Sequence, residues 1–535
     1  MTERGEVSRR RFFSDTAAFL SSGFLFGLAS LLPEAAEAAE AFRAAAGEEI
    51  SFIEGAWNYK ISPWSGDDFT LGHRMRMGQL PPLPRSVTGK ADFVIVGGGL
   101  SGLAAAHYLK DHSFLLLEQY GDFGGQSRGD SYRGIGYSYG AAYFAQDFGE
   151  TGKLFQEYKL KPVRLSEKRD AFYFDGKWFA GTDGPESDLL YKQFKQLKAD
   201  CREIWNIFPE DIEKELPLDN AELAKLDATP FSGCLQGYSE NFLALLDSFL
   251  KSAACGGINH LSALAAYWIL EDLVAPVFVL PGGNPALTRA MKEGLQKAAP
   301  ERMKSGAFVW SVELTENGAF VAYSDREGQG HRVECKHVIV STPPLVTARI
   351  LRNMPDSEKA RLFWFRYGSY LVANYLLRKP VLERHYDNWF SPPFSFADIT
   401  VAETPYMEAG SYKESMGSVL TVYQPYPPSS AGRPMLLQGD RKAITGALSE
   451  QLSNLSADLK AALERVVVSR WGHAMAVLTP GYFKHLGELS HRHDAGKELP
   501  FSLAHCSMHG GPFAESAIAA AKKAADRALK RTTAQ

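Results

Sequence analysis

The clearest hydrophobic pattern in the chain lies between residues 91 and 118. A short apolar run, Asp92-Phe-Val-Ile-Val96, is followed by a glycine-rich stretch, a helix-forming segment from Leu103 to Lys110 and a second apolar run, Phe114-Leu-Leu-Leu117. Short apolar runs of this kind are typical of strands buried on both faces of a parallel sheet. The order of strand, helix and strand therefore predicts a βαβ unit of an α/β fold.

The turn that follows the first strand carries Gly97, Gly99 and Gly102 at the spacing Gly-x-Gly-x-x-Gly. The first glycine permits a tight turn, the second lets a pyrophosphate approach the backbone, and the third lets helix and strand pack closely. The start of the helix then offers free N–H groups to phosphate. Glu118, which ends the second strand, is placed to accept hydrogen bonds from an adenosine ribose. We expect a dinucleotide site, with NAD and FAD both open at this point.

Other parts of the chain show shorter patterns. Residues 173–178 predict a hairpin with Asp175-Gly176 as its turn, and residues 308–340 predict an alternating hairpin around Asn317-Gly318 and a returning strand. Apolar residues recur at helical spacing in three segments, 241–250, 261–273 and 444–468. Residues 42–90 are rich in Pro, Gly and Arg without sustained periodicity, so we expect an irregular arm there.

The N-terminus has a pattern of its own. Ser8-Arg-Arg-Arg-Phe-Phe13 precedes a mildly apolar stretch from Thr16 to Leu32, and small-residue sites follow at 36–38 and 39–41. This arrangement predicts a twin-arginine signal peptide over residues 1–41, hence a periplasmic protein exported by the twin-arginine machinery. A membrane anchor is the alternative, although a span usually takes about 20 strongly apolar residues. Export after folding favours a protein with a cofactor.

Composition and charge limit the classes of molecule that we expect as partners. The chain has 535 residues, 45% of them hydrophobic, which is enough for a large core and most consistent with two domains. A formal charge of −4 gives no support for nucleic acid as a partner and favours small molecules. The five cysteines are scattered without a Cys-x-x-Cys pair, so neither a disulfide framework nor a metal site is predicted.

The segment Asp122-Phe-Gly-Gly-Gln-Ser-Arg128 resembles the second glycine pair of the flavin-containing amine oxidoreductases, which packs against the FAD diphosphate. The resemblance implies FAD as the cofactor. It also implies a Rossmann-like FAD-binding domain of the glutathione reductase type, interleaved with an α+β substrate-binding domain. Gln126 stands where most members have arginine, and Arg128 offers a forked donor set to an anion two positions later.

Three further segments carry the same resemblance: residues 281–287, residues 308–344, where the backbone of Val309 meets the adenine, and residues 502–518. They imply a discontinuous FAD-binding domain of residues 91–145, 275–345 and 476–535, with 146–274 and 346–475 forming the substrate-binding domain. In the last segment Ser507 replaces the usual acid before the helix. The glycine turns and the resemblance together imply these cofactor-binding residues: Gly97, Gly99, Leu100, Ser101, Gly102, Glu118, Gln119, Gly125, Gln126, Arg128, Val309, Ser507 and Ala514.

Within the family, the chain is most similar to the spermidine dehydrogenase-like branch. The residues that carry this similarity lie at 122–125, 370–378, 418–423, 470–473 and 516–518. In the family, hydride passes from the carbon beside an amine to flavin N5. Many oxidases place a lysine near N5, whereas this chain has Val372, Ala373 or Asn374 there. We therefore expect a dehydrogenase of an amine, including polyamines, that uses a quinone, a cytochrome or another periplasmic electron acceptor.

The family also flanks the amine with aromatic side chains. The matching positions here are Tyr482 and Phe513, and ordinary core packing explains both equally well. Trp471 and His473 are two further catalytic candidates. A histidine beside the flavin would act as a base near neutral pH, but a structural role is the favoured reading. Glu271 and Asp272 either steer a polycation or belong to a solvated helix face.

Two other functions fit the same residues. One is an FAD-dependent desaturase or oxidoreductase of an apolar substrate that is not an amine, for which a hydrophobic tunnel without acids would be the signature. The other is a flavoprotein partner subunit without turnover, which the departures at Gln126, Val372 and Ser507 permit. A flavin spectrum that an amine bleaches without oxygen would distinguish the amine enzyme from both.

Overall fold

The computed structural model describes residues 47–165, 169–209, 219–382, 385–495 and 499–533. The signal peptide predicted over residues 1–41 lies outside the described residues. In the part of the chain that is described, no helix combines the length and the apolar character needed to cross a bilayer.

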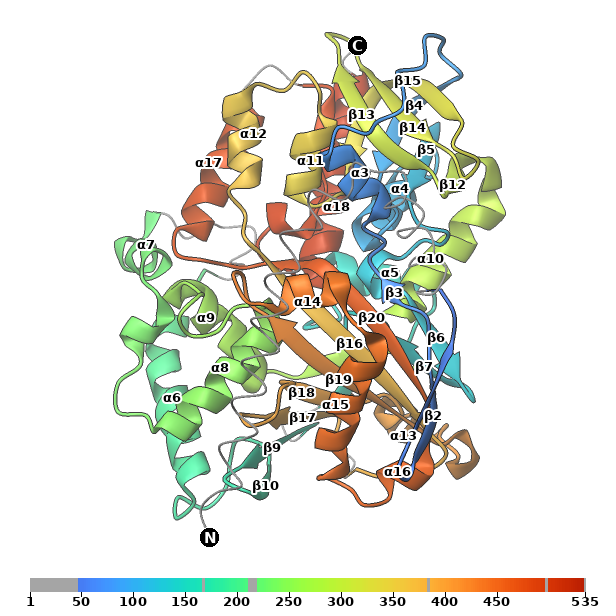
Figure 1. Cartoon of the computed structure of the whole chain (residues 1–535). Helices are drawn as coiled ribbons and strands as arrows, with labels where there is room; N and C mark the ends of the chain where they lie inside the picture. The colour runs from blue at the N-terminus through green and yellow to red at the C-terminus, as the bar shows by residue number, and fades with distance from the viewer. Residues whose placement is uncertain (1–46, 166–168, 210–218, 383–384, 496–498, 534–535) are drawn as a thin grey trace.

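The upper lobe in Figure 1 is built on a seven-stranded sheet, in which five strands run parallel and β13 and β14 extend it antiparallel from β15. Its strands come from three separate parts of the chain, and β4 and β5 are the two strands expected around the glycine turn, joined by the expected helix. The predicted βαβ unit is thus confirmed. The parallel strands, in spatial order, are β12 (Met303–Ser305), β5 (Phe114–Glu118), β4 (Gly89–Val96), β15 (Gly330–Val340) and β21 (Phe501–Leu503).

Each face of this sheet buries a different layer. Phe93 and Ile95 point to a face covered by α4 (Leu100–Tyr108), α10 (Pro285–Ala298) and α18 (Ala514–Thr533). Val94 and Val96 point to the opposite face, which is covered by the antiparallel strands β13 (Phe308–Leu314) and β14 (Ala319–Ser324). The alternation of side chains along β4 therefore requires cover on both faces, as the continuous apolar run predicts.

The lower lobe holds a ten-stranded mixed sheet between two groups of helices (Figure 1). One face packs on α6 (Leu189–Trp205), α7 (Ala221–Ala228), α8 (Glu240–Ala254) and α9 (Ala263–Ile269), and the other on α14 (Gly432–Gln438), α15 (Arg441–Ser453) and α16 (Leu459–Ala462). The strand order is β1 (Ile50–Glu54), β2 (Trp57–Ile61), β20 (Leu463–Ala476), β16 (Tyr367–Leu377), β19 (Ser418–Tyr426), β18 (Asp398–Val401), β17 (Asp387–Phe390), β9 (Asp170–Phe174) and β10 (Lys177–Ala180), with β3 (Ser65–Gly66) beside β20.

Smaller elements connect the two lobes or cover their edges. They are α3 (Thr70–Arg76), β6 (Gly129–Tyr132), β7 (Ile135–Ser138), α5 (Gly149–Glu157), β8 (Val163–Leu165), β11 (Val277–Val279), α11 (Pro344–Ile350), α12 (Asp356–Phe363), α13 (Thr404–Glu408) and α17 (Tyr482–Ala495). The predicted hairpin at 173–178 is confirmed, and Asp175 and Gly176 both have positive φ, as a two-residue hairpin turn of type I′ requires.

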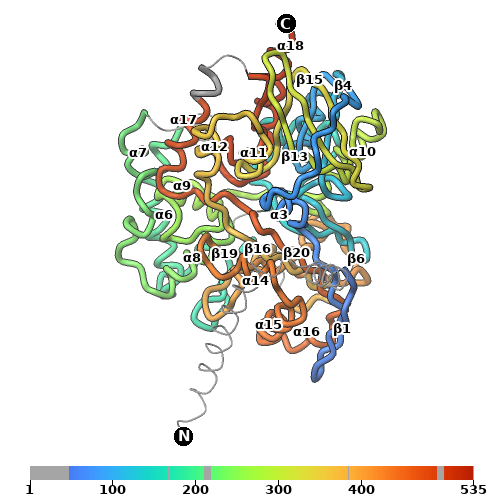
Figure 2. Tube along the Cα trace, turned by 45° about the horizontal axis from the view of Figure 1, so that its top comes forward, coloured from blue at the N-terminus to red at the C-terminus, as the bar shows by residue number. Residues whose placement is uncertain are grey.

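Two predictions about local structure are wrong. The described part of the expected irregular arm, residues 47–90, is not irregular throughout, because β1, β2 and β3 join the ten-stranded sheet, and in Figure 2 the blue chain of β1 runs beside α16. Trp57, Tyr59 and Ile61 alternate inward, but this run is too short to stand out in the sequence. The helix expected over 444–468 is not continuous: α15 ends at Ser453 and α16 at Ala462. β20 then begins at Leu463, because Val466–Val468 are β-branched and pair with β16.

Candidate functional site

The first glycine turn lies at the carboxyl end of β4 and leads directly into α4. Gly97 has φ +102°, which an L side chain rarely adopts. A Cβ on Gly102 would lie 1.8 Å from the carbonyl oxygen of Gly97, so the first turn of α4 packs against the end of β4 without room for any side chain. Leu100 and Ser101, which start the helix, are buried between these two glycines and the sheet.

The second glycine turn packs directly against the first. The amide of Gly124 donates to the carbonyl of Gly98 at 2.7 Å, and a Cβ on Gly125 would lie 2.9 Å from the Cα of Gly99. Gly124 has φ +121°. Backbone thus meets backbone beside the start of α4, with no room for a side chain between the two turns. A helix start that a ligand can approach without meeting side chains suits a diphosphate.

Glu118 ends β5 beside these turns. One carboxylate oxygen accepts a hydrogen bond from the amide of Gly98 at 2.6 Å, and the other accepts one from the amide of Tyr120 at 2.8 Å. Burial raises the pKa of Glu118, while these amides act in the opposite direction. The carboxylate is therefore fixed in place with lone pairs left for ribose hydroxyls, and Gln119 beside it is exposed.

Glu118→Gln is expected to weaken FAD binding by about 10- to 100-fold, because a hydrogen bond to a charged group contributes about 1.5–3 kcal/mol. The amide keeps the shape of the side chain but halves its acceptors. Fluorescence titration of flavin-free protein with FAD measures the change. Glu334→Gln, at an exposed acid of β15 that pairs with Lys90, is the matched control and should leave the affinity unchanged. Equal affinity in both variants would contradict the role of Glu118.

Arg128 ties the second glycine turn to the N-terminal strands. Its guanidinium donates to the carbonyls of Gly125 and Gly66 at 3.1 and 2.9 Å and lies 4.6 Å from the ring centre of Tyr120. The Tyr120 hydroxyl donates to Asp67 at 3.0 Å. The phosphate-binding role expected for Arg128 stays a prediction, and the structure adds a positioning role that the sequence pattern did not indicate.

Asp67 and Gln126 each form a hydrogen bond to the backbone of β20, close to the second glycine turn. The carboxylate of Asp67 accepts a hydrogen bond from the amide of Gly472 at 2.7 Å, and the amide group of Gln126 donates to the carbonyl of Ala474 at 2.6 Å. Burial raises the pKa of Asp67. Gln126 therefore holds the glycine turn to β20 of the ten-stranded sheet.

The remaining cofactor candidates converge on the same edge of the parallel sheet. Val309 is buried on β13, whose approach is fixed by a 2.7 Å hydrogen bond from the amide of Ala307 to the carbonyl of Glu118. Ser507 is buried in the turn before α18, which begins at Ala514 and packs along α4. The glycine turns, the fixed acid and the convergent segments together fit an FAD.

One face of the ten-stranded sheet lies next to this edge. Register pairs place Val372 of β16 beside Tyr423 of β19, and Tyr423 beside Asp398 of β18. Their side chains share a face, because directly opposed residues of paired strands point the same way. Ala373 points to the other face, among the side chains packed against α15. Of the three positions considered for the missing lysine, Val372 and Asn374 thus lie on the face that carries Tyr423 and Trp471, called the aromatic face from here on, and Ala373 does not.

The chain that follows the second glycine pair crosses this face. The indole N–H of Trp471 donates to the carbonyl of Tyr139 at 2.7 Å, the hydroxyl of Tyr423 donates to that of Gly140 at 3.0 Å, and the Asn374 amide donates to that of Ser138 at 3.0 Å. Trp471 is paired with Tyr370 in register and lies on the same face. The structure thus brings Trp471 next to residues 138–140, the part of the chain that follows the second glycine pair.

The other catalytic candidates have different surroundings. Tyr482 is fully buried among Trp364, Phe365 and Phe483, and its hydroxyl donates to the carbonyl of Ser507 at 3.1 Å. Of the two roles that the sequence left open for Tyr482, these contacts favour core packing over an aromatic wall.

Phe513 and His473 are the two remaining catalytic candidates. The half-buried ring of Phe513 meets Trp268 edge to face with ring centres 5.1 Å apart, just before α18. Burial, reinforced by Arg433, lowers the pKa of His473 to about 3. At neutral pH this imidazole is uncharged and contacts the guanidinium of Arg433. It does not titrate near pH 7, so the structural reading is favoured over a catalytic base.

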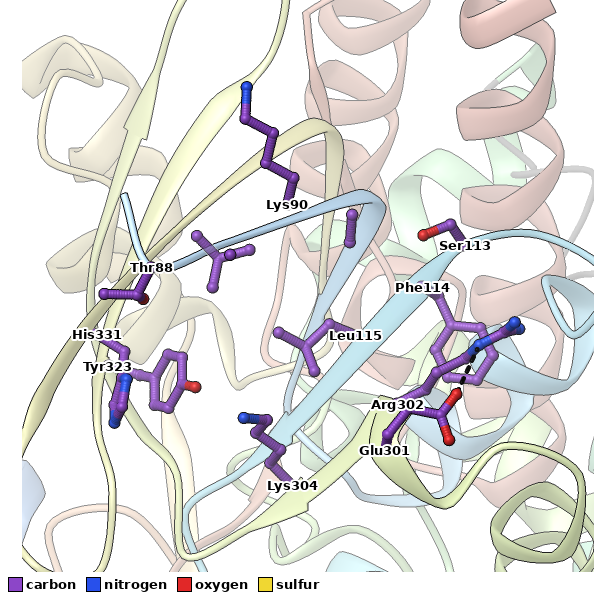
Figure 3. Close-up of a pocket in the computed structure, with 13 residues that line it drawn as sticks. Thr88, Lys90, Ser113, Phe114, Leu115, Glu301, Arg302, Lys304, Tyr323 and His331 are labelled. Atoms are coloured by element: carbon purple, nitrogen blue, oxygen red, sulfur yellow. Dashed lines mark ion pairs between the residues drawn. The ribbon is translucent and has the colours of Figure 1, made fainter. Parts of the chain in front are cut away.

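A hollow of about 310 Å³ lies at the opposite edge of the parallel sheet (Figure 3). Thr88 and Phe114, at the amino ends of β4 and β5, line it together with Lys304, Tyr323 and His331. Nucleotides bind at the carboxyl ends of parallel strands, so this hollow is separate from the dinucleotide site.

Sequence reasoning missed the polar residues of the aromatic face. Asp398 and Asp387 are 3% and 2% exposed, and Tyr370 and Tyr423 meet edge to face with ring centres 5.9 Å apart. The signal that was available is an acid at the start of an otherwise buried apolar strand, as in Asp398-Ile-Thr-Val401.

Comparison with known proteins agrees with this geometry. The sequence profile of the family described as flavin containing amine oxidoreductase matches residues 100–529. The chain is 23% identical to the oxidoreductase PigB of a Serratia species over 369 residues, which cover 57% of this chain and 55% of that protein. It is 24% identical to the flavin-containing amine oxidase A of Canis lupus familiaris over 288 residues, 51% of this chain and 53% of that protein. The chain thus spans little more than half the length of these relatives.

Solved structures show the same fold over more of the chain. Cyclohexylamine oxidase from Brevibacterium oxydans superposes with a TM-score of 0.64 at 16% identity and covers 83% of this chain and 99% of that one. A wild-type putrescine oxidase bound to putrescine superposes with a TM-score of 0.62 at 18% identity and covers 82% of this chain and 99% of that one.

Proposed function

This chain belongs to the flavin-containing amine oxidoreductase family, whose members bind FAD, and from that premise we propose that it is an exported amine dehydrogenase. The observation that carries the proposal is the aromatic face formed by Val372, Tyr423 and Trp471, which the cofactor-side segment 138–140 crosses. Acids on this face disfavour an apolar substrate, which would require an uncharged tunnel.

When bound, FAD supplies the acceptor for a hydride. The substrate carbon next to the amine loses a hydride, and the nitrogen becomes an iminium that water hydrolyses to an aldehyde and an amine. Both electrons then leave for the external acceptor. In this scheme Tyr423 and Trp471 exclude water and orient the C–H bond, and their polar atoms are already held by the carbonyls of Gly140 and Tyr139.

A dehydrogenase rather than an oxidase is proposed because Val372 carries no proton or charge to assist oxygen. Its side chain is buried in the aromatic face, and neither Ala373 nor Asn374 supplies an amine there. The twin-arginine signal expected at residues 8–13 supports a periplasmic quinone or cytochrome as the acceptor. Amines in the range from monoamines to polyamines are the substrates that the proposal covers.

Purified protein without residues 1–41 is expected to show a flavin spectrum that amines bleach without oxygen. Reoxidation by a soluble quinone should be much faster than reoxidation by oxygen, with little hydrogen peroxide formed. Stopped-flow absorbance and a peroxide assay measure these rates. The Val372→Lys variant is the matched comparison and should gain reactivity with oxygen. Absence of flavin or of bleaching would refute amine oxidation, and rapid stoichiometric peroxide from the unmodified protein would refute the dehydrogenase assignment alone.

A further inference from the structure

Five basic side chains from four elements come together beside the second glycine turn. They are His73 and Arg76 of α3, Arg349 of α11, Arg433 of α14 and His473 of β20. In Figure 2 the three helices lie next to one another near the centre of the view. Arg76 and Arg433 are exposed, so another molecule can reach this group of residues, called the basic surface from here on.

The charges of these residues act on one another. The guanidinium of Arg433 contacts the ring of His473. Burial lowers the pKa of His473 to about 3, and the charges of Arg433, Arg349, His73 and Arg76 all contribute in the same direction. Burial and the charge of Arg76 likewise lower the pKa of Arg349. Because guanidinium groups stay protonated in proteins, three positive charges repel one another here.

The acid near these charges already has hydrogen-bond partners. Asp67 is the acid whose charge acts on Arg433. Its carboxylate accepts hydrogen bonds from the hydroxyl of Tyr120 at 3.0 Å and from the amide of Gly472 at 2.7 Å. Arg349 donates to a backbone carbonyl of its own helix at 2.6 Å, and a carbonyl carries no net charge. One carboxylate thus faces three guanidinium groups, so the surface is positive.

Exposed apolar side chains lie among these charges. The ring of Phe363, on α12, is 42% exposed and lies 4.9 Å from the guanidinium of Arg349. Met77, which follows Arg76 at the end of α3, is 58% exposed. Protein interfaces combine apolar contacts with a polar rim, and opposite charge on the partner speeds the encounter. A small anion needs the charges alone, whereas the combination found here fits an acidic protein.

The basic surface lies next to the proposed reaction site. On β20, His473 follows Trp471 of the aromatic face by two residues. The side chain of Gln126, in the second glycine turn, donates to the carbonyl of Ala474, the next residue of the strand. Leu345, at the start of α11, packs against the core cluster that includes Trp471. A protein docked on this surface therefore lies close to the glycine turn that suits the cofactor.

We propose that the basic surface docks an acidic one-electron carrier protein, which accepts the electrons released by amine oxidation. This inference rests on the proposed function and names the class of its electron acceptor. The hydride taken from the amine corresponds to two electrons and one proton. Each carrier molecule accepts one electron, so two carriers are reduced for each amine, and the proton is released to water.

The test compares two forms of one carrier: native cytochrome c, which is basic, and succinylated cytochrome c, whose lysines carry acids. The holoenzyme is reduced with one equivalent of dithionite, so that no amine is needed, and stopped-flow absorbance follows reduction of the cytochrome. At about 0.01 M ionic strength the succinylated form should react about 10-fold faster than the native form. At about 0.15 M the difference should shrink, because salt screens the charges.

The double variant Arg76→Gln, Arg433→Gln removes two charges of the surface. Its rate constant with succinylated cytochrome c, divided by that with an uncharged quinone, should fall by about 10-fold. Arg202→Gln, at an exposed arginine of α6, is the matched control and should keep this ratio unchanged. Sedimentation of the oxidised holoenzyme with succinylated cytochrome c measures docking without turnover, and the double variant should bind about 10-fold more weakly.

The outcomes separate the docking surface from the proposed function. Equal rates with the two cytochromes, or an equal loss with cytochrome and quinone in the double variant, would overturn the docking surface and leave amine oxidation standing. Loss of flavin from the purified double variant would assign these charges to the FAD diphosphate and would also overturn the inference. If no amine reduces the flavin but the double variant loses its reaction with succinylated cytochrome c alone, the proposed function fails and the docking surface stands.

Discussion

A Gly102→Ala variant is expected to fold poorly and to contain no bound FAD. Its Cβ would lie 1.8 Å from the carbonyl oxygen of Gly97 and 3.0 Å from the hydroxyl of Ser341, so α4 would have to move away from β4. That shift would separate the amides of the helix start from the second glycine turn, which is in backbone contact with the first. Loss of flavin absorbance in the purified variant measures the effect.

Gly72→Ala is the matched control for this change. Gly72 lies in α3, where an added Cβ meets no atom within 4 Å, and alanine is about 1 kcal/mol better than glycine in a helix. We expect full flavin content and an equal or higher melting temperature. A Gly102→Ala protein with normal flavin content would show that the close packing of α4 on β4 is not required for the cofactor.

Arg128→Ala is expected to give the second largest loss, in both stability and FAD affinity. The change removes two hydrogen bonds to the carbonyls of Gly66 and Gly125 and the stacking on Tyr120. Hydrogen bonds made by charged groups contribute about 1.5–3 kcal/mol each, so we expect the free energy of unfolding to fall by about 3 kcal/mol. The second glycine turn would then be free of the N-terminal strands, and FAD binding should weaken with it.

Denaturant unfolding and FAD titration measure these two effects. Arg128→Lys keeps the charge but loses the forked geometry, so it should recover only part of the loss. Arg133→Ala, at an exposed arginine that pairs with Glu464, is the control and should cost at most about 1 kcal/mol. If Arg128→Ala unfolds like the control and keeps its FAD, the link between the glycine turn and residues 65–67 has no energetic role.

Local sequence was sufficient for the βαβ unit and its glycine turn. The run from Asp92 to Glu118 specifies strand, glycine turn, helix, strand and acid through contacts between neighbours along the chain, and the structure contains each of them in place. The turn at Asp175-Gly176 was predicted equally well, because positive φ at two consecutive residues depends on the identity of those residues alone.

Sequence patterns gave less accurate predictions where the structure depends on pairing with a distant segment of the chain. Residues 50–66 form strands only because β20 provides an edge for β2 and β3, and β20 itself begins inside a segment whose apolar spacing also suits a helix. For Tyr482 the sequence left core packing and substrate contact open, and only the surrounding rings of Trp364, Phe365 and Phe483 favour core packing.

The sequence by itself determined the dinucleotide turn and the acid that follows it, because these rest on the conformational freedom of glycine and on residues close together in the chain. The expectation of FAD came from the resemblance to the flavin-containing amine oxidoreductases. Only the tertiary structure brought Asp170, Asp387 and Asp398 onto one face with Val372 and Tyr423. Strand register decides which side chains meet, and register is set by pairing between segments more than two hundred residues apart, as for β9 and β17. Which side chains meet on this face is for that reason a property of the folded sheet.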